Sequence, residues 1–200
     1  DRLLAQGGST LLSEVPEMFG AETLLMQRCR NRGIFDKCVD MINDFKRYFS
    51  RYGQVIYENP SPGNKDGGIS TLEDKSLGCT QKGGCGLVSD VLAIGEPLQA
   101  KGLNLLTGPG NDMVATTLLT AAGAHLVLFT TGRGTPFGGV VPTMKISSNS
   151  ALAQRKPRWI DFDAGRLLAA DADSAALDDE FFDQVLACAS GALARNEQEG

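Results

Sequence analysis

The chain has 200 residues, a formal net charge of -5 and a sequence pI near 4.9. Phosphate binding normally shows as a surplus of basic residues, so this acidic balance argues against a nucleic-acid partner. Hydrophobic residues make up 42% of the chain and charged residues 22%, which is typical of a soluble globular protein. No apolar run approaches the roughly 20 residues that cross a membrane, so we expect no membrane partner.

The cysteines are an odd set of five, scattered along the chain rather than spaced as a disulfide framework: Cys29, Cys38, Cys79, Cys85 and Cys188. Unpaired thiols are typical of a reducing compartment, and we find no targeting signal, so we expect a cytoplasmic protein. The chain begins at Asp1 in the middle of a pattern. We therefore expect a single α/β domain over residues 1–200 that belongs to a longer polypeptide.

The first predicted element is a buried strand within residues 7–15, which ends at a polar Ser13-Glu14 tip and is stopped by Pro16. A helix is expected over residues 20–30. A second, strongly amphipathic helix is indicated by apolar residues at helical spacing. They are Phe35, Cys38, Ile42, Phe45 and Phe49. This apolar face can pack internally or carry the contact of a possible homodimer.

Residues 58–68, ENPSPGNKDGG, are rich in proline, glycine and asparagine, which excludes regular structure and predicts a long loop. A short helix is expected to follow, with Ser70 and Glu73 as its capping box and Gly78 closing it. Residues 87–94 are apolar enough for either a strand or a buried helix, and periodicity does not separate the two.

A buried strand is predicted over residues 103–106, and a Gly-Pro-Gly turn follows it over residues 108–111. A helix is then expected over residues 112–122, capped by Asn111 or Asp112, and another buried strand over residues 125–130. Strand, turn, helix and strand make a βαβ unit, which predicts an α/β fold with a mostly parallel sheet covered by helices on both faces. Further strands are expected at 140–146 and 159–162, with helices at 150–154 and 178–194.

Ligands of open α/β sheets bind beyond the carboxyl ends of the strands, so we expect the turn at 108–110 and the glycine-rich loop at 132–139 to converge there. In GPGND the exposed N–H groups of a helix start favour an anion. Asp112 either caps this helix or holds a divalent cation through its oxygens.

The segment GRGTPFGG, residues 132–139, lets the backbone approach a ligand, while Arg133 offers a planar guanidinium to a carboxylate. The alternative is a rigid turn with a solvated arginine. Its glycine spacing fits neither the dinucleotide loop nor the phosphate-binding P-loop. His125, the only histidine, is interpreted as a core residue.

Glu73 and Lys75 can serve as proton acceptor and donor if they share a pocket, although exposed surface charge is the ordinary interpretation of such residues. Cys79 and Cys85 lie in GCTQKGGC with a spacing that matches neither zinc nor iron–sulfur sites. One thiolate can still contribute to a metal site, although two small loop or core thiols are the preferred interpretation.

Several long segments together resemble the galactarate and altronate dehydratase family, which includes the large subunit of sulfolactate sulfo-lyase. They are NPSPGNKDGG, TLEDKSLGCTQKGG, GLNLLTGPGND, LVLFTTGRGTPFGG and WIDFDAG, within residues 7–168. The resemblance implies a Rossmann-like variant fold, a divalent metal, typically Fe2+, and elimination from a small hydroxy acid. It also implies a small N-terminal β-rich domain and a Cys-Gly-Gly-Ser segment upstream of residue 7, so the chain corresponds to the C-terminal part of a longer dehydratase.

The resemblance also implies roles for individual residues. The metal would take Asp112 with Glu14 or Cys79 nearby, and Glu73 and Lys75 would be the acid–base pair. The substrate-binding residues would be Asn64, Lys65, Gly110, Arg133, Gly134 and Thr135. The metal cation and positive side chains would stabilise the enediolate that forms when the substrate loses its α-proton.

Three alternatives remain open. The first is elimination of sulfite from sulfolactate, which the same enediolate would serve. The second is an altronate dehydratase, but TQKGGCG differs from the expected altronate pattern, which favours the galactarate or sulfolactate branch. A third alternative is a non-catalytic module that binds an anionic metabolite through the two glycine turns.

Overall fold

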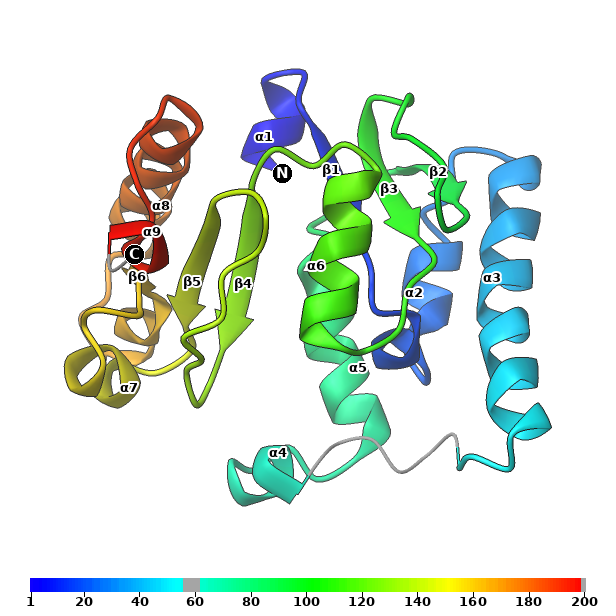
Figure 1. Cartoon of the computed structure of the whole chain (residues 1–200), viewed down its shortest axis with the longest axis horizontal. Helices are drawn as coiled ribbons and strands as arrows, with labels where there is room; N and C mark the ends of the chain where they lie inside the picture. Colours follow the sequence, from blue (N-terminus) through cyan, green and yellow to red (C-terminus); the bar gives the residue numbers. More distant parts are fainter. Residues whose placement is uncertain (56–61, 199–200) are drawn as a thin grey trace. The chain divides into compact units, whose positions relative to one another are not determined.

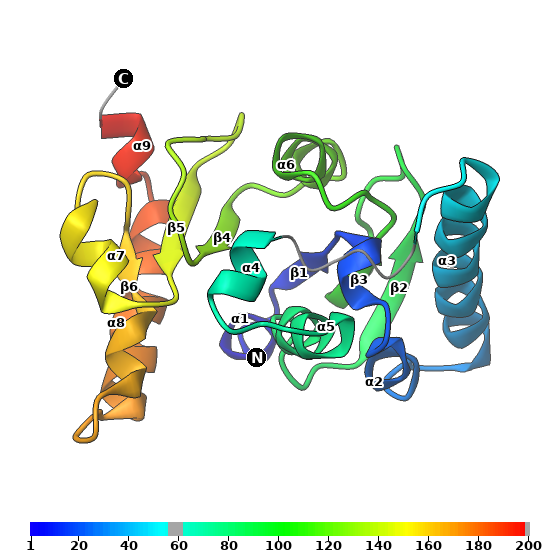
Figure 2. The same ribbon diagram turned by 90° about the horizontal axis from the view of Figure 1, so that it is seen from below.

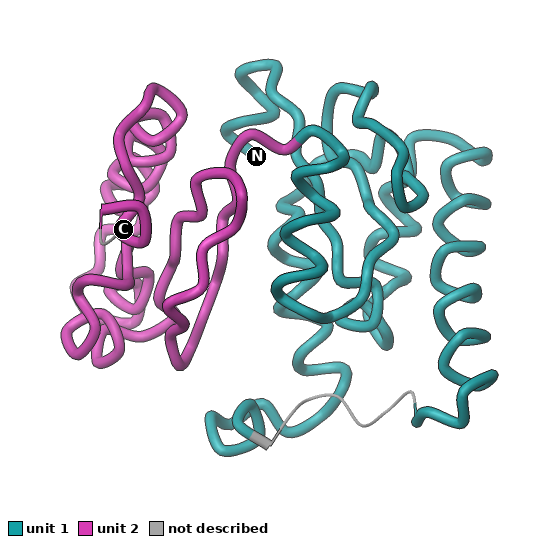
Figure 3. Tube along the Cα trace, viewed as in Figure 1, with its two compact units in different colours: residues 1–123 teal, residues 124–200 magenta. Residues whose placement is uncertain are grey.

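The computed structural model describes residues 1–55 and 62–198, which form two compact units, residues 1–123 and residues 124–200 (Figure 3). Each unit is built around its own parallel sheet of three strands, with helices packed against it. The predicted α/β class with parallel strands and covering helices is therefore confirmed. Among the helices of the described residues, none is long and apolar enough to cross a membrane.

The first unit contains, in chain order, the following elements (Figure 1). They are α1 (Arg2–Ala5), β1 (Ser9–Leu12), the 3-10 helix η1 (Val15–Met18), α2 (Glu22–Met26), α3 (Arg32–Arg51), α4 (Pro62–Asp66), α5 (Leu72–Gln81), β2 (Val88–Leu92), β3 (Gly102–Leu106) and α6 (Asp112–Ala121). The strand order is β1-β3-β2, with Leu11 opposite Asn104 and Val91 opposite Leu105. The carboxyl ends of all three strands therefore meet at one edge of the sheet.

Both faces of this sheet are covered (Figure 2). Leu103 and Leu105 of β3 pack into a core with residues of η1, α2 and α3. Leu106, one position further along the strand, packs on the other face with Leu118 of α6. This alternation explains why β3 is an almost continuous apolar run, since a strand covered on both faces has no solvent side.

The amphipathic helix predicted over Phe35 to Phe49 is α3. It buries Cys38, Met41 and Ile42 in the core of the first unit. Its N-cap is Asn31, whose side chain accepts a hydrogen bond from the Ile34 amide. The apolar stripe therefore packs internally.

The second unit contains β4 (Val127–Thr131), β5 (Thr143–Ser147), α7 (Ser150–Arg155), β6 (Phe162–Asp163), the 3-10 helix η3 (Ala164–Leu168), α8 (Ser174–Ala189) and α9 (Arg195–Gln198). The strand order is β4-β5-β6, and both pairings are parallel. Leu177 of α8 packs on Ile146 and Phe162, so α8 covers one face of this sheet. Asp173 caps α8 by accepting hydrogen bonds from two backbone amides of its first turn.

The prediction that the strands at 103–106 and 125–130 share one sheet is wrong, because β3 pairs with β1 and β2, whereas β4 pairs with β5. Burial along β4 alternates, and Leu128 is 39% exposed, as expected for the edge strand of a separate small sheet. His125 precedes β4 and is exposed, so its interpretation as a core residue is also wrong.

Two local predictions differ from the structure. Residues 62–66 form the short helix α4 inside the predicted loop, where Pro62 occupies the first helical position and its fixed φ suits a helix start. Of the same loop, residues 58–61 lie outside the described residues. The N-cap of α5 is Thr71 rather than Ser70, because the Thr71 hydroxyl accepts a hydrogen bond from the Asp74 amide at 3.1 Å. Gly78 does not end this helix but lies inside it. Residues 87–94, left open as strand or helix, contain the strand β2.

Candidate functional site

The carboxyl ends of β1 and β3 lie side by side, and two hydrogen bonds join the segments that follow them. The Ser13 hydroxyl donates to the carbonyl of Leu106 at 3.2 Å, and the amide of Val15 donates to the carbonyl of Gly108 at 2.9 Å. The Ser13-Glu14 tip and the Gly-Pro-Gly turn therefore meet at one edge of the sheet, as predicted for a ligand site of an α/β fold.

Glu14 occupies the left-handed region, with φ 65° and ψ 60°, and is the single non-glycine residue with positive φ among the described residues. A glutamate gains nothing local from this conformation, which costs free energy relative to the extended or helical regions. Such strain is frequent at functional sites. Charged residues of α5 and α6, Lys75 and Asp112, act on the Glu14 carboxyl.

Burial raises the pKa of the Glu14 carboxyl above its usual value. The positive charges of Lys82 and Lys75 oppose this shift, whereas the carboxylates of Glu17 and Asp112 add to it. Glu14, Glu17 and Asp112 thus form a group of interacting carboxylates with two lysines nearby. We call these five residues the carboxylate cluster.

Glu17 is a member of the cluster that sequence reasoning missed. One of its carboxylate oxygens, Oε2, lies 2.8 Å from Nζ of Lys75 and 3.5 Å from the thiol of Cys79, which donates to it. The side chains of Lys75 and Glu17 are 18% and 12% exposed, so this ion pair is largely shielded from water. Its signal in the sequence was a second acidic residue in SEVPEM, directly after a buried strand.

The Gly-Pro-Gly turn approaches the cluster closely. A Cβ atom at Gly110 would lie 3.2 Å from Oε1 of Glu17, and one at Gly108 would lie 2.5 Å from the Ser13 hydroxyl oxygen. Glycine is required at 108 because any side chain would displace Ser13. The turn therefore packs directly against the Ser13 to Glu17 segment.

The start of α6 settles which residue caps it. Asn111 is the N-cap and accepts from the Val114 amide at 3.2 Å. The Asp112 carboxylate, exposed in the first turn, is thus not needed for capping and takes part in the cluster through its charge. The cap interpretation of Asp112 is wrong.

The predicted pairing of Glu73 with Lys75 is not what the structure shows. Glu73 is exposed, and its Cγ packs near Gly20, where a Cβ would approach it to 3.2 Å. Lys75 instead pairs with Glu17. Asn64 and Lys65 lie in α4 with Lys65 exposed, and within the described residues neither side chain makes a hydrogen bond or ion pair with the carboxylate cluster.

The predicted metal ligands do not assemble into a complete set. Within residues 1–55 and 62–198, no group of three or more His, Cys, Asp or Glu side chains is arranged to hold a metal ion. Burial and the Glu17 carboxylate raise the pKa of the Cys79 thiol to about 11, so this thiol is protonated at neutral pH and acts as a hydrogen-bond donor. The predicted ligands Asp112, Glu14 and Cys79 therefore fit only part of a metal site. We derive no chemical step through a metal.

The glycine-rich loop belongs to the second unit, whereas the Gly-Pro-Gly turn belongs to the first, so their convergence stays a prediction. Arg133 is exposed. Gly134 has φ 80°, and its amide donates to the Thr131 hydroxyl at 2.9 Å. The hydroxyl oxygen of Thr135 accepts from the Phe137 amide at 3.2 Å. Gly134 and Thr135 thus shape the loop, and the structure leaves their predicted contact with substrate open.

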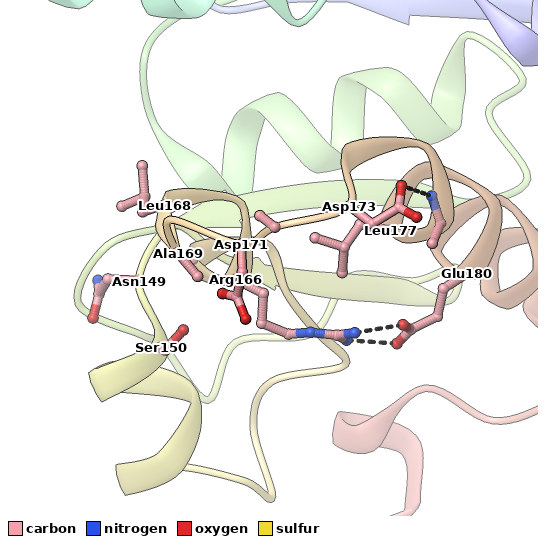
Figure 4. A pocket seen from close by; sticks show the side chains of 12 residues that line it. Asn149, Ser150, Arg166, Leu168, Ala169, Asp171, Asp173, Leu177 and Glu180 are labelled. Carbon is pink, nitrogen blue, oxygen red and sulfur yellow. Dashed lines mark hydrogen bonds and ion pairs between the residues drawn. The ribbon is translucent and has the colours of Figure 1, made fainter.

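A cavity of about 610 Å³ in the second unit lies between η3 and α8 (Figure 4). Arg166 and Glu180 form a two-pronged ion pair across it, with both N–O distances 2.8 Å. Arg166 and Glu180 thus neutralise each other, and none of the described residues lining the cavity was predicted as a site residue. We assign it no role in the chemistry.

Comparison with known proteins matches the whole chain, residues 1–200, to the family model for the C-terminal part of D-galactarate/altronate dehydratase. The chain is 60% identical over 198 residues to altronate dehydratase of Bacillus subtilis, covering 99% of this chain and 40% of that protein. It is 32% identical over 192 residues to galactarate dehydratase (L-threo-forming) of Escherichia coli, covering 96% and 37%. It is 28% identical to (2R)-sulfolactate sulfo-lyase subunit beta of Chromohalobacter salexigens over 196 residues, 96% of this chain and 50% of that subunit.

Proposed function

Because this chain belongs to the D-galactarate/altronate dehydratase family, we propose that it supplies catalytic residues to a hydro-lyase that removes water from a sugar acid. The chain spans about 40% of the length of the altronate dehydratases it matches. The observation that carries the proposal is the carboxylate cluster at the carboxyl ends of β1 and β3, with the shielded Lys75–Glu17 ion pair at its centre.

We propose altronate as the substrate. Identity to the altronate dehydratases is 60%, against 32% to the galactarate dehydratase and 28% to the sulfo-lyase subunit. The segment TQKGGCG, residues 80–86, favoured the galactarate or sulfolactate branch, and these identities favour the altronate branch instead. Seven residues of one loop weigh less than identity over nearly the whole chain.

Elimination requires that a base removes the proton α to the carboxylate and that an acid protonates the departing β-hydroxyl. The electron pair of the C–H bond passes through an enediolate, the C–O bond breaks, and the enol product becomes a 2-keto acid with release of water. A protonated amine can act as the acid when it reaches the departing hydroxyl, and a neighbouring carboxylate can hold the amine in position.

We assign the acid role to Lys75, with Glu17 as the positioning residue that holds its ammonium group. For the base we assign Glu14 in place of Glu73, because the charge of Glu14 interacts with that of Lys75, whereas Glu73 is exposed beside Gly20. Six residues remain proposed substrate contacts, as the family resemblance implies: Asn64, Lys65, Gly110, Arg133, Gly134 and Thr135.

A divalent cation, Fe2+ by resemblance, is part of the proposal, with Asp112 as its protein ligand. Carboxylate oxygens suit a hard or borderline cation, and the ion would help to neutralise the enediolate. Cys79 would have to release the proton that its thiol now donates to Glu17 in order to serve as a second ligand. The remaining ligands would be water, substrate oxygens or groups beyond the described residues.

We also propose a cytoplasmic location and a homodimer. All five cysteines are free, which suits a reducing compartment. Tyr48 and Tyr52 at the end of α3 are 56% and 62% exposed, and their rings lie in contact with centroids 5.0 Å apart and planes inclined by 58°, which gives a small aromatic surface for self-association. Light scattering of the purified protein tests the homodimer.

The test of the function is an assay of the full-length protein on altronate, galactarate and sulfolactate, under reducing conditions, with and without ferrous iron. We expect a 2-keto acid from altronate, formed faster than from galactarate. Release of sulfite from sulfolactate in place of a keto acid would transfer the assignment to the sulfo-lyase branch. Binding of all three acids without turnover would replace it with a non-catalytic binding module.

A further inference from the structure

The central strand of the second unit has a buried polar face. Thr143, Lys145 and Ser147 alternate along β5 and are all fully buried, while Ile146 between them faces the apolar core under α8. Lysine is among the residues least often buried completely. A fully buried lysine on the central strand therefore needs a partner that explains it.

Two residues of this face hold the glycine-rich loop in place. The Gly139 amide donates to the Thr143 hydroxyl oxygen at 2.9 Å, and Nζ of Lys145 donates to the carbonyl of Phe137 at 2.8 Å. Thr143 is satisfied, since its hydroxyl also donates to the carbonyl of Val141 at 2.9 Å. Residues 137–139 are thus folded over the polar face of β5.

Lys145 is not satisfied in the same way. An ammonium group has three donors, and within the described residues its one hydrogen-bond acceptor is the Phe137 carbonyl. Burial lowers the pKa of Lys145, and the Asp161 carboxylate only partly opposes this. Both Asp161 oxygens already accept backbone amides, from Lys145 at 2.7 Å and from Arg195 at 2.8 Å.

A cavity of about 380 Å³ opens at this ammonium group. Its lining includes Arg158, Trp159 and Asn196 together with Lys145, and none of its described lining residues is acidic. The Oδ1 atom of Asn196 is buried and has no hydrogen-bond partner. Its volume lies within the range of small-molecule sites, roughly 300–1,000 Å³.

We propose that this cavity binds a hydroxycarboxylate, with the carboxylate on the ammonium of Lys145 and a hydroxyl donating to Oδ1 of Asn196. Carboxylate oxygens accept the hydrogens that Lys145 has left over, and they also suit the guanidinium of Arg158 at the same wall. A hydroxyl supplies the donor that a carboxylate lacks. The Trp159 ring, which carries Nζ of Lys156 at 3.9 Å from its centroid, forms a flat side for the carbon chain.

All residues of this site belong to the second unit, whereas those of the carboxylate cluster belong to the first. The donors and acceptors of the cavity carry this inference, and only the choice of a sugar acid as the probe rests on the proposed function. Turnover by the full-length protein without binding in this cavity would remove this inference and leave the proposed function intact. Binding in this cavity without turnover by the full-length protein would remove the proposed function and leave this inference intact.

Trp159 is the single tryptophan of the chain, so its fluorescence reports on the cavity. We would titrate the 200-residue chain with galactarate at constant ionic strength, and with galactitol, the neutral polyol of the same carbon skeleton. We expect a saturable change with galactarate and none with galactitol. No saturable change with galactarate, or an equal change with galactitol, would overturn the proposal.

Variants separate the site from general charge effects. Lys145→Met should weaken galactarate binding about tenfold or more, while Lys101→Met, the same change at an exposed lysine, should leave it unchanged. If circular dichroism shows that Lys145→Met does not fold, the test uses Arg158→Met instead, a change at an exposed residue of the cavity rim. This variant should bind galactarate several-fold more weakly. Unaltered affinity in the folded Lys145→Met variant, or in Arg158→Met when that variant decides, would reject the site.

Discussion

Nζ of Lys75 lies 2.8 Å from Oε2 of Glu17, in an ion pair whose two side chains are 18% and 12% exposed. The pair joins α5 to η1, two elements distant in the sequence, at the carboxyl ends of β1 and β3. Removing one member of a shielded pair leaves the other charge without compensation, which costs more than the pair contributes when both are present.

We therefore expect Glu17→Gln to lower the free energy of unfolding by about 1–3 kcal/mol, because the ammonium of Lys75 loses the charge of the Glu17 carboxylate in a poorly solvated place. Urea denaturation measures the change. The matched control is Glu180→Gln, which removes the carboxylate of an exposed pair with Arg166 and should change stability little. Equal effects of the two substitutions would show that the Lys75–Glu17 pair is no more shielded than a surface pair.

The raised pKa of Glu14 predicts that this residue lowers the stability of the fold by an amount that depends on pH. An unfolded glutamate titrates near 4.5, and the folded Glu14 releases its proton at higher pH because of burial. Between these two values the folded state binds more protons than the unfolded state, so the contribution of Glu14 to stability falls as pH rises. As the pH rises from 4 to 8, the melting temperature of Glu14→Gln should thus increase relative to that of the parent chain.

Glu22 provides the control of opposite sign. Its carboxylate accepts from Nζ of Lys46 at 2.7 Å, and this contact holds its pKa below the usual value despite burial. Its stabilising contribution is present above the unfolded pKa and is lost as pH falls through the folded one. Glu22→Gln should therefore be less stable than the parent at pH 8 and approach it in acid. Parallel pH curves for the two variants would contradict the assignment for Glu14.

The sequence predicted elements whose signals are local. The spacing of Cys38 and Ile42 indicated α3, and the Gly-Pro-Gly pattern indicated the turn before α6; the structure confirms both. Strand pairing is not local: β3 and β4 are both apolar, but which strand each bonds to depends on the whole chain. The Glu17 contact was missed for the same reason, since nothing near Glu17 in the sequence points to Lys75.

The candidate site was predicted in part. Glu14, Lys75, Gly110 and Asp112 do lie around one edge of the first sheet, because strand ends and helix starts can be located from turn residues. Glu73 was predicted beside Lys75, and the contact of Lys75 with Glu17 was missed because it depends on how α5 packs on η1.

Gly134 should resist substitution for two separate reasons. Its φ of 80° is unfavourable for any other residue, and a Cβ there would lie 3.0 Å from Cδ1 of Leu152. Gly123 also has positive φ, 107°, but has open space around its Cβ position. Gly123→Ala should cost about 1 kcal/mol from the backbone alone, and Gly134→Ala more. A melting temperature lowered equally in both would show that the Leu152 contact is relaxed without cost.

The cap of α5 can be tested by a pair of neighbouring substitutions. Thr71 accepts from the Asp74 amide, whereas the Ser70 hydroxyl donates to the exposed Asp74 side chain at 3.2 Å. Thr71→Ala should destabilise the chain by about 1 kcal/mol, and Ser70→Ala by clearly less. Chemical denaturation of both variants measures the difference. The reverse order would restore the Ser70 capping box that the sequence pattern indicated.

The most direct measurement is the rate of 2-keto acid formation from altronate by the full-length protein carrying Lys75→Met. Loss of a general acid lowers turnover by roughly 10²–10⁴-fold, and we predict a fall of at least about 100-fold in kcat, with Lys101→Met unchanged as the control. Circular dichroism should show that the variant remains folded. Turnover equal to that of the unmodified protein would contradict the assignment of Lys75, held by Glu17, as the catalytic acid.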